Sequence, residues 1–183
     1  MTVKGPLPTT SLMDQAFVDA AWYRDSFATR HVTALPDVIT CFIAVFGHRP
    51  DWMKQILIAR NRLARAIGLA APDRDEVLNF PHQASYRVGD CIGTWPIHAL
   101  GPDEIIAGRD NSHLDFRLSI MRCQTPMGWQ VRASTLCKVH NLFGRIYLVL
   151  ILPFHRKGLQ WLLDRALTSG RLGTPAPDPG QTA

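Results

Sequence analysis

The sequence predicts an α+β fold in which a curved antiparallel sheet of about six strands wraps around one long C-terminal helix, with two shorter helices after the first strand. Hairpin-length connections separate a run of strand-like segments between residues 86 and 139, as in an antiparallel meander. Helical patterns precede this run, and a long apolar helical pattern follows it. The chain has 183 residues, 46% of them hydrophobic, which is enough for one core.

We therefore expect a single domain over residues 23–168. Residues 1–22 and 169–183 hold Pro, Gly, Ser and Thr without periodicity, so we expect a loose N-terminal segment and a disordered tail. The N-terminus has no apolar stretch typical of a signal peptide, and the most apolar run, Ile146–Phe154, is about half of the ~20 residues that cross a bilayer. A cytoplasmic protein without a transmembrane segment is expected.

The first elements are a strand and two helices. Weak alternation around Phe27 predicts a strand over Asp25–Val32. Pro36 and Asp37 suit the start of a short, buried helix, "PDVITCFIAVF". Asp51 can cap a second helix, "WMKQILIARNRLARAIGL", which has an apolar and a basic side. The apolar side would hold Trp52, Ile56, Ala59, Leu63 and Ile67, and the basic side Lys54, Arg62 and Arg65.

The strand-like run divides at "GPDE", "DNS" and "TPMG". The predicted strands are Tyr86–Ile92, Gly93–Leu100, Glu104–Arg109, His113–Cys123 and Trp129–Val139. Gly89 and Gly93 suggest a bend or bulge of the kind that a curved sheet needs. The last helix is predicted from about Phe143 to Leu167, with Pro153 as a kink, Asn141 as its cap, and Gly144 for close approach to the sheet.

One segment, "HLDFRLS", raises the question of an acid–base row. Alternation places His113, Asp115, Arg117 and Ser119 on one face and Leu114, Phe116, Leu118 and Ile120 on the other. A four-residue loop, Thr125–Gly128, brings the apolar rows of both strands onto one face. It places Asp115 opposite Lys138 and His113 opposite His140. The polar row is then more consistent with a solvated outer face than with a catalytic row.

The apolar face between sheet and last helix predicts a small-molecule cavity. Its expected lining is Trp95, Trp129, Tyr147 and Phe154, with Thr135, Cys137 or His155 as polar points. The alternative is a filled core in which the same aromatic side chains simply pack. Both interpretations use the same residues, and the sequence leaves them open.

Several motifs resemble known families. The order of elements resembles the helix-grip superfamily of START lipid-transfer domains, polyketide cyclases and the birch pollen allergen. More closely, "LIARNRLARAIGL", "VGDCIG", "HLDFRLS" and "VHNLFGRIYLVLILPFHR" are similar to a bacterial family known as domain of unknown function 2867. That resemblance implies no activity. Because His113 and Asp115 lie in one of the shared motifs, it makes them somewhat stronger candidates for functional residues. Family members also occur fused behind nicotinamide-dependent reductase domains, but no G-x-G-x-x-G turn occurs here.

The leading functional hypothesis is a pocket protein for a lipid-like, aromatic or polyketide-like molecule. A second is a small cofactor-independent cyclase, hydrolase or isomerase that uses His113, Asp115, His140 or His155 for acid–base chemistry. A third is an interaction domain that presents a basic helix face, although nucleic acid is the less favoured partner because no Lys/Arg block occurs in a chain of net charge +5. No metal or cofactor motif is present, the four cysteines are widely separated, and the oligomeric state is not predicted.

Overall fold

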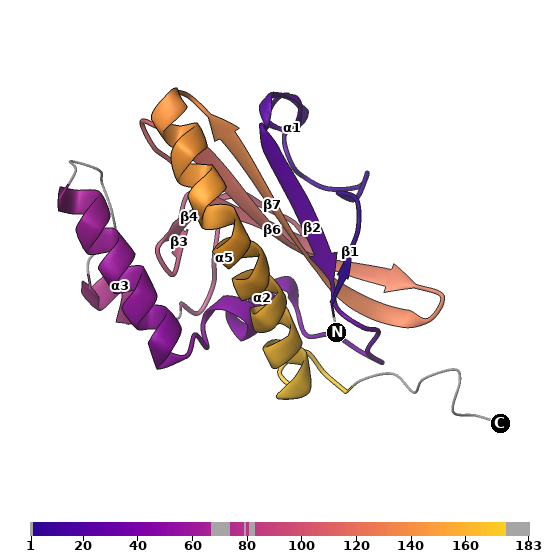
Figure 1. Ribbon diagram of the computed structural model, residues 1–183. Helices are drawn as coiled ribbons and strands as arrows, with labels where there is room; N and C mark the ends of the chain where they lie inside the picture. Colours follow the sequence, from indigo (N-terminus) through magenta and orange to yellow (C-terminus); the bar gives the residue numbers. More distant parts are fainter. Residues whose placement is uncertain (1, 67–73, 79, 81–82, 175–183) are drawn as a thin grey trace.

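The protein is an α+β domain with an open antiparallel sheet and a long C-terminal helix (Figure 1). A computed structural model describes residues 2–66, 74–78, 80 and 83–174. The sheet has seven strands in the order β1-β2-β7-β6-β5-β4-β3, one more than expected. The strands are β1 Val3–Lys4, β2 Tyr23–Ala28, β3 Cys91–Ile92, β4 Trp95–Leu100, β5 Glu104–Asp110, β6 Leu114–Thr125 and β7 Gly128–Val139.

The helices begin where the sequence offers caps. They are α1 Gln15–Ala20, α2 Val38–Phe46, α3 Asp51–Ala66, α4 Arg74–Leu78 and α5 Leu142–Thr168. The Asp37 carboxylate accepts a hydrogen bond from the Thr40 amide at 3.0 Å, and the Asn141 side chain accepts one from the Gly144 amide at 2.9 Å. The predicted cap Asn141 is confirmed, and Asp37, expected at the start of its helix, is the N-cap of α2. Asp51, which was predicted to cap the next helix, is instead the first residue of α3. Pro153 lies inside α5, which continues past it.

The first strands differ from the sequence prediction. β2 begins at Tyr23 and ends at Ala28, and Val32 makes only an isolated bridge to Trp129. The predicted strand Tyr86–Ile92 is confined to Cys91–Ile92, because Gly89 and Gly93 adopt left-handed φ values of 95° and 61° that turn the chain. The glycines therefore end a strand here, where a bend within a strand was expected.

The β6–β7 hairpin has the predicted register, but its loop consists of two residues, Pro126 and Met127, where four were expected. Thr125 pairs with Gly128, Asp115 lies opposite Lys138, and the His140 amide donates to the His113 carbonyl at 3.1 Å. Leu118 and Ile120 lie in the main core together with residues of α2 and α5. The prediction of which row faces the last helix is confirmed.

The opposite face of the sheet is covered by the N-terminal segment, for which a loose conformation was expected. Met13 and Ala21 pack against Ile106 and Leu136, which point away from α5. Buried Glu104 accepts hydrogen bonds from the Ser11 hydroxyl at 2.7 Å, the Leu12 amide and the Ser119 hydroxyl. The expected solvated outer face is therefore only partly solvated, because this side of the sheet also carries apolar residues that need cover. Residues 175–183 of the expected tail lie outside the described residues.

The apolar side of α3 is rotated from the predicted one. Trp52 and Ile56 are 52% and 57% exposed, and Ala59 is exposed, whereas Ile58 and Asn61 are buried. The physical reason is that α3 stands beside α5 rather than on the sheet (Figure 1). The Trp52 ring packs against that of Trp161 of α5, with 5.6 Å between ring centroids. The Leu63 side chain and Ile67 lie outside the described residues. Within the described segments, none of the helices combines the length and apolar character needed to cross a membrane.

The packing of α5 on the sheet predicts that alanine substitutions at its two glycines have opposite effects on stability. A Cβ at Gly144 would overlap the His113 carbonyl oxygen, whereas one at Gly158 would meet only the Met53 Cε, at 3.9 Å. Gly144→Ala should lower the free energy of unfolding by about 2 kcal/mol, because the helix must move off the sheet. Gly158→Ala should raise it by up to about 1 kcal/mol through helix propensity. Urea unfolding followed by circular dichroism measures both, and equal midpoints for the two variants would contradict this packing.

The Glu104 contacts predict that its removal releases the N-terminal segment. Glu104→Ala leaves buried hydroxyl donors without their acceptor and should cost about 2 kcal/mol or more. Proteolysis before residue 21 should become faster than in the wild type. Asp103→Ala is the matched control, because Asp103 makes a half-exposed ion pair with Arg122 at 3.4 Å, which contributes under about 1 kcal/mol. Equal protection in both variants would show that Glu104 does not hold the segment.

Candidate functional site

A polar cluster centred on a buried acid lies between the sheet and α5, with one member, Arg156, half-exposed. Its members, named here the Asp25 cluster, are Tyr23, Asp25, Thr135, His155 and Arg156. Tyr23 pairs with Cys137 and Asp25 with Thr135 across β2 and β7, so these side chains share the face toward the helix. α5 adds His155 and Arg156, two and three residues after Pro153.

Asp25 is the centre of the cluster. Its side chain is 0% exposed, and Oδ2 accepts a hydrogen bond from the Tyr23 hydroxyl and lies 3.5 Å from Arg156 Nε. Arg156 Nε also donates to the Tyr23 oxygen at 3.0 Å, and the guanidinium lies over the tyrosine ring. The second carboxylate oxygen, Oδ1, is buried and has no hydrogen-bond partner among the described residues. One acceptor of a buried acid is thus left open.

The surroundings set the protonation of the neighbouring groups. Burial and the hydrogen bond to Asp25 raise the pKa of Tyr23 above its usual range, so its hydroxyl stays protonated. Burial lowers the pKa of His155 and so favours the neutral ring, although the nearby Asp25 acts in the opposite direction. Burial raises the pKa of the Cys137 thiol to about 12, which keeps it from acting as a thiolate. His155 Nε2 and Thr135 Oγ1 are hydrogen-bonded at 3.0 Å.

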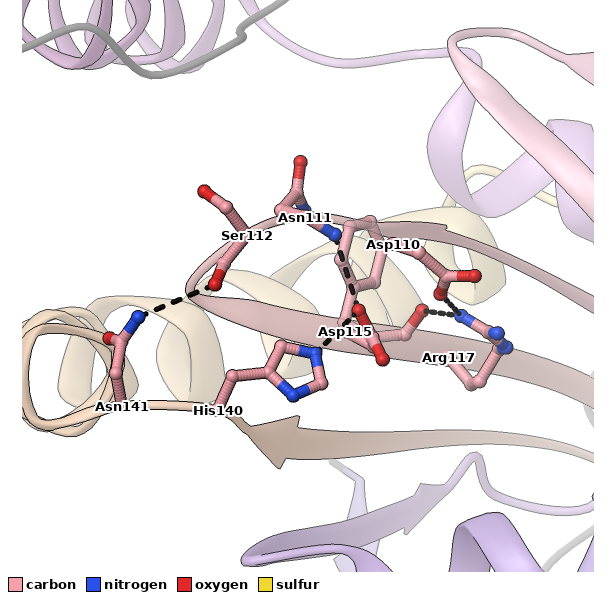
Figure 2. Close-up of polar contacts among 8 residues, drawn as sticks. Asp110, Asn111, Ser112, Asp115, Arg117, His140 and Asn141 are labelled. Atoms are coloured by element: carbon pink, nitrogen blue, oxygen red, sulfur yellow. Dashed lines mark hydrogen bonds and ion pairs between the residues drawn. The ribbon is translucent and has the colours of Figure 1, made fainter.

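A second polar group occupies the end of the β5–β6 hairpin (Figure 2). His140 Nε2 lies 2.9 Å from Asp115 Oδ1, and the same oxygen accepts from the Asn111 amide at 3.2 Å. Arg117 forms an ion pair with Asp110 at 2.5 Å, which lowers the pKa of that carboxyl. The Asp115 side chain is 15% exposed and that of His140 33%. These contacts tie the hairpin loop to the end of β7, which is a structural role.

His113 does not join this polar row. The first residue of β6 is Leu114, so the alternation does not extend to His113, whose buried ring packs against Phe143 and Tyr147 of α5. Burial lowers the pKa of His113, and its Nδ1 has no partner among the described residues. The sequence placement of His113 on one face with Asp115 is corrected by this contact.

The structure does not bring the predicted ligand residues into one cavity. Trp95 packs among Phe42, Phe46 and Phe116 in the core. Trp129 lies at the far end of the hairpin beside Arg122. Tyr147 contacts Arg60 of α3, while Phe154 is 77% exposed on the outer side of α5. Only Thr135 belongs to the Asp25 cluster, and of the proposed acid–base residues only His155 does. The two acid–base candidates His140 and His155 have different partners, Asp115 and Thr135.

Two hollows open elsewhere on the molecule. One of about 170 Å³ lies at the start of α5, beside His140 and Arg145. Another of about 240 Å³ lies on the opposite face, between Phe17, His98 and Arg117. Neither is lined by a member of the Asp25 cluster. Within the described part of the chain, no group of His, Cys, Asp and Glu is arranged to hold a metal ion.

The sequence interpretation missed Tyr23, Asp25 and Arg156. The available signal was the alternation of "YRDSF", which puts Asp25 between Tyr23 and Phe27 on the buried face. An acid within an apolar row is unusual enough to mark a site. The predicted strand began at Asp25, so that row was not seen in full.

Comparison with known proteins gives one match. The family model described as "Protein of unknown function (DUF2867)" matches residues 17–158. No curated protein and no solved structure matches. The matched range includes every member of the Asp25 cluster.

The buried histidine predicts a pH effect on stability. Because the folded-state pKa of His155 is below its ordinary value of 6.5, the unfolded chain binds more protons as the pH falls below that value. Stability should therefore fall between about pH 7 and about pH 5. His155→Gln, which keeps a hydrogen bond to Thr135, should remove part of this loss, with the remainder due to other groups such as His98 and His113. Urea unfolding at both pH values tests this, and an unchanged pH dependence in the variant would contradict it.

Proposed function

Since this chain belongs to the DUF2867 family, whose description assigns no activity, we propose a function from its geometry. The protein binds a small, largely apolar molecule between the sheet and α5, and the Asp25 cluster anchors an O–H or N–H group of that molecule. Lipid-like, aromatic and polyketide-like compounds that carry a hydroxyl or amine fit this description.

The observation that carries the proposal is the open oxygen of Asp25. A buried carboxylate is expensive unless it is fully hydrogen-bonded, and Asp25 Oδ1 has no donor among the described residues. Tyr23 and Arg156 compensate Oδ2 only. A donor on a bound molecule would supply the missing hydrogen bond to Asp25 Oδ1. This gives a physical reason for an acid at this position.

Apolar walls adjoin the cluster. Tyr23 and Cys137 pack with Leu114 and Leu148, and Leu152 of α5 packs against the same group. These side chains pack against one another between the sheet and α5. Binding of a molecule there therefore requires that the first half of α5 moves away from the sheet. Pro153 supports such a movement, because it removes a helical hydrogen bond where the two halves of α5 meet. A sheet covered by one long C-terminal helix also supports membership of the helix-grip superfamily, which the order of the predicted elements suggested.

A second candidate is a cofactor-independent enzyme at the same place. Two titratable groups favour it, because burial lowers the pKa of His155 and raises that of Tyr23. The neutral His155 could then act as a base and the protonated Tyr23 as an acid. Turnover of a copurified molecule by the wild type, but not by His155→Gln, would favour this alternative.

Binding is tested with 1-aminoanthracene, a fluorescent probe that joins an apolar ring system to one amine donor. The wild type should bind it, and Asp25→Asn should weaken binding about tenfold through loss of a charged acceptor. Asp115→Asn is the matched control, since Asp115 belongs to the hairpin contacts outside the cluster. Native mass spectrometry of the purified protein checks for a copurified molecule. Absence of both probe binding and a copurified molecule, or equal binding by the two variants, would count against the proposal.

A further inference from the structure

One side of α5 is turned away from the sheet (Figure 1). Several apolar side chains of this helix are exposed to solvent. We name these residues the outer stripe: Leu142, Ile146, Val149, Leu150 and Phe154. Each is more than half exposed, and their three- and four-residue spacing places them along one side of the helix for about 18 Å. Exposed apolar surface of this extent marks an interaction site more often than it serves stability.

Cations border the outer stripe. Arg145 is exposed on α5, one residue before Ile146 of the stripe. Arg60 of α3 approaches α5, where its Nε donates to the Tyr147 hydroxyl at 2.9 Å. Lys157 follows Phe154 at the end of the stripe and is exposed.

Carboxylates are absent from the same stretch. Residues 142–163 contain no Asp or Glu, and Asp51, at the start of α3, is the one acid of that helix. An apolar stripe edged by Arg and Lys, without compensating acids, is complementary to a surface that is both apolar and anionic. A leaflet with acidic headgroups is such a surface.

We propose that the outer stripe of α5 docks on an anionic lipid bilayer, with the helix lying in the plane of the headgroups. Leu150 and Phe154 enter the acyl boundary, while Arg145 and Lys157 contact lipid phosphates. This inference is independent of the proposed small-molecule site, which faces the other side of α5. A second copy of the chain is the competing occupant, but pairing two stripes would bring their arginines and Lys157 close together, and like charges repel.

Vesicle cosedimentation with the full chain tests the docking. Wild-type protein should bind vesicles of equal parts phosphatidylcholine and phosphatidylglycerol, bind phosphatidylcholine alone far less, and be released by added salt. Leu150→Glu should weaken binding at least about tenfold, since it removes an apolar contact and adds a repelled charge. Met127→Glu is the matched control, because Met127 is an equally exposed apolar residue at the β6–β7 turn. Unchanged thermal unfolding of both variants confirms that they fold.

The charged border is tested separately. Arg145→Gln combined with Lys157→Gln should weaken binding to the mixed vesicles about thirtyfold. Failure of the wild type to bind those vesicles would overturn the proposal, as would equal losses for Leu150→Glu and Met127→Glu. A wild-type dimer in light scattering that Leu150→Glu dissociates, without vesicle binding, would assign the stripe to a second copy instead.

Discussion

The register of the β6–β7 hairpin is the constraint on which the rest of the structure depends. Pairing of Thr125 with Gly128 sets every later pair, including Phe116 with Cys137 and Asp115 with Lys138. A shift by one residue would exchange the two faces of both strands. The core beneath α5, the position of Thr135 in the Asp25 cluster and the starting point of α5 at the end of β7 all follow from this pairing.

The sheet also has two faces that need cover, and this accounts for the remaining architecture. α2 and α5 bury one face, and residues 7–21 bury much of the other. α3 packs beside α5 and not on the sheet, so Trp52 and Ile56 remain exposed. The functional proposals both concern α5 because it is the element with chemistry on two sides, polar groups toward β2 and apolar side chains toward solvent.

The Asp25 cluster illustrates why a packed structure can retain an imperfect interaction. Replacing a buried ionic group by apolar residues of similar volume often stabilises a protein, so such groups tend to reflect a demand other than stability. Tyr23 and Arg156 satisfy one oxygen of Asp25 and leave the other open. Pro153 lies close to His155 and Arg156 in α5, and it removes one helical hydrogen bond beside the cluster.

The sequence by itself determined the features that depend on local pattern: the register and face assignment of the hairpin, the cap Asn141, the start of the buried α2 at Asp37, and the extent of α5. Alternation, turn length and capping chemistry act between near neighbours, so they are readable in one dimension. Only the tertiary structure decided that Arg156 meets Asp25 and Tyr23, that His113 packs under α5, and that Glu104 holds the N-terminal segment. These contacts join residues far apart in the chain, and their free energy depends on which surfaces remain to be buried after the sheet has formed.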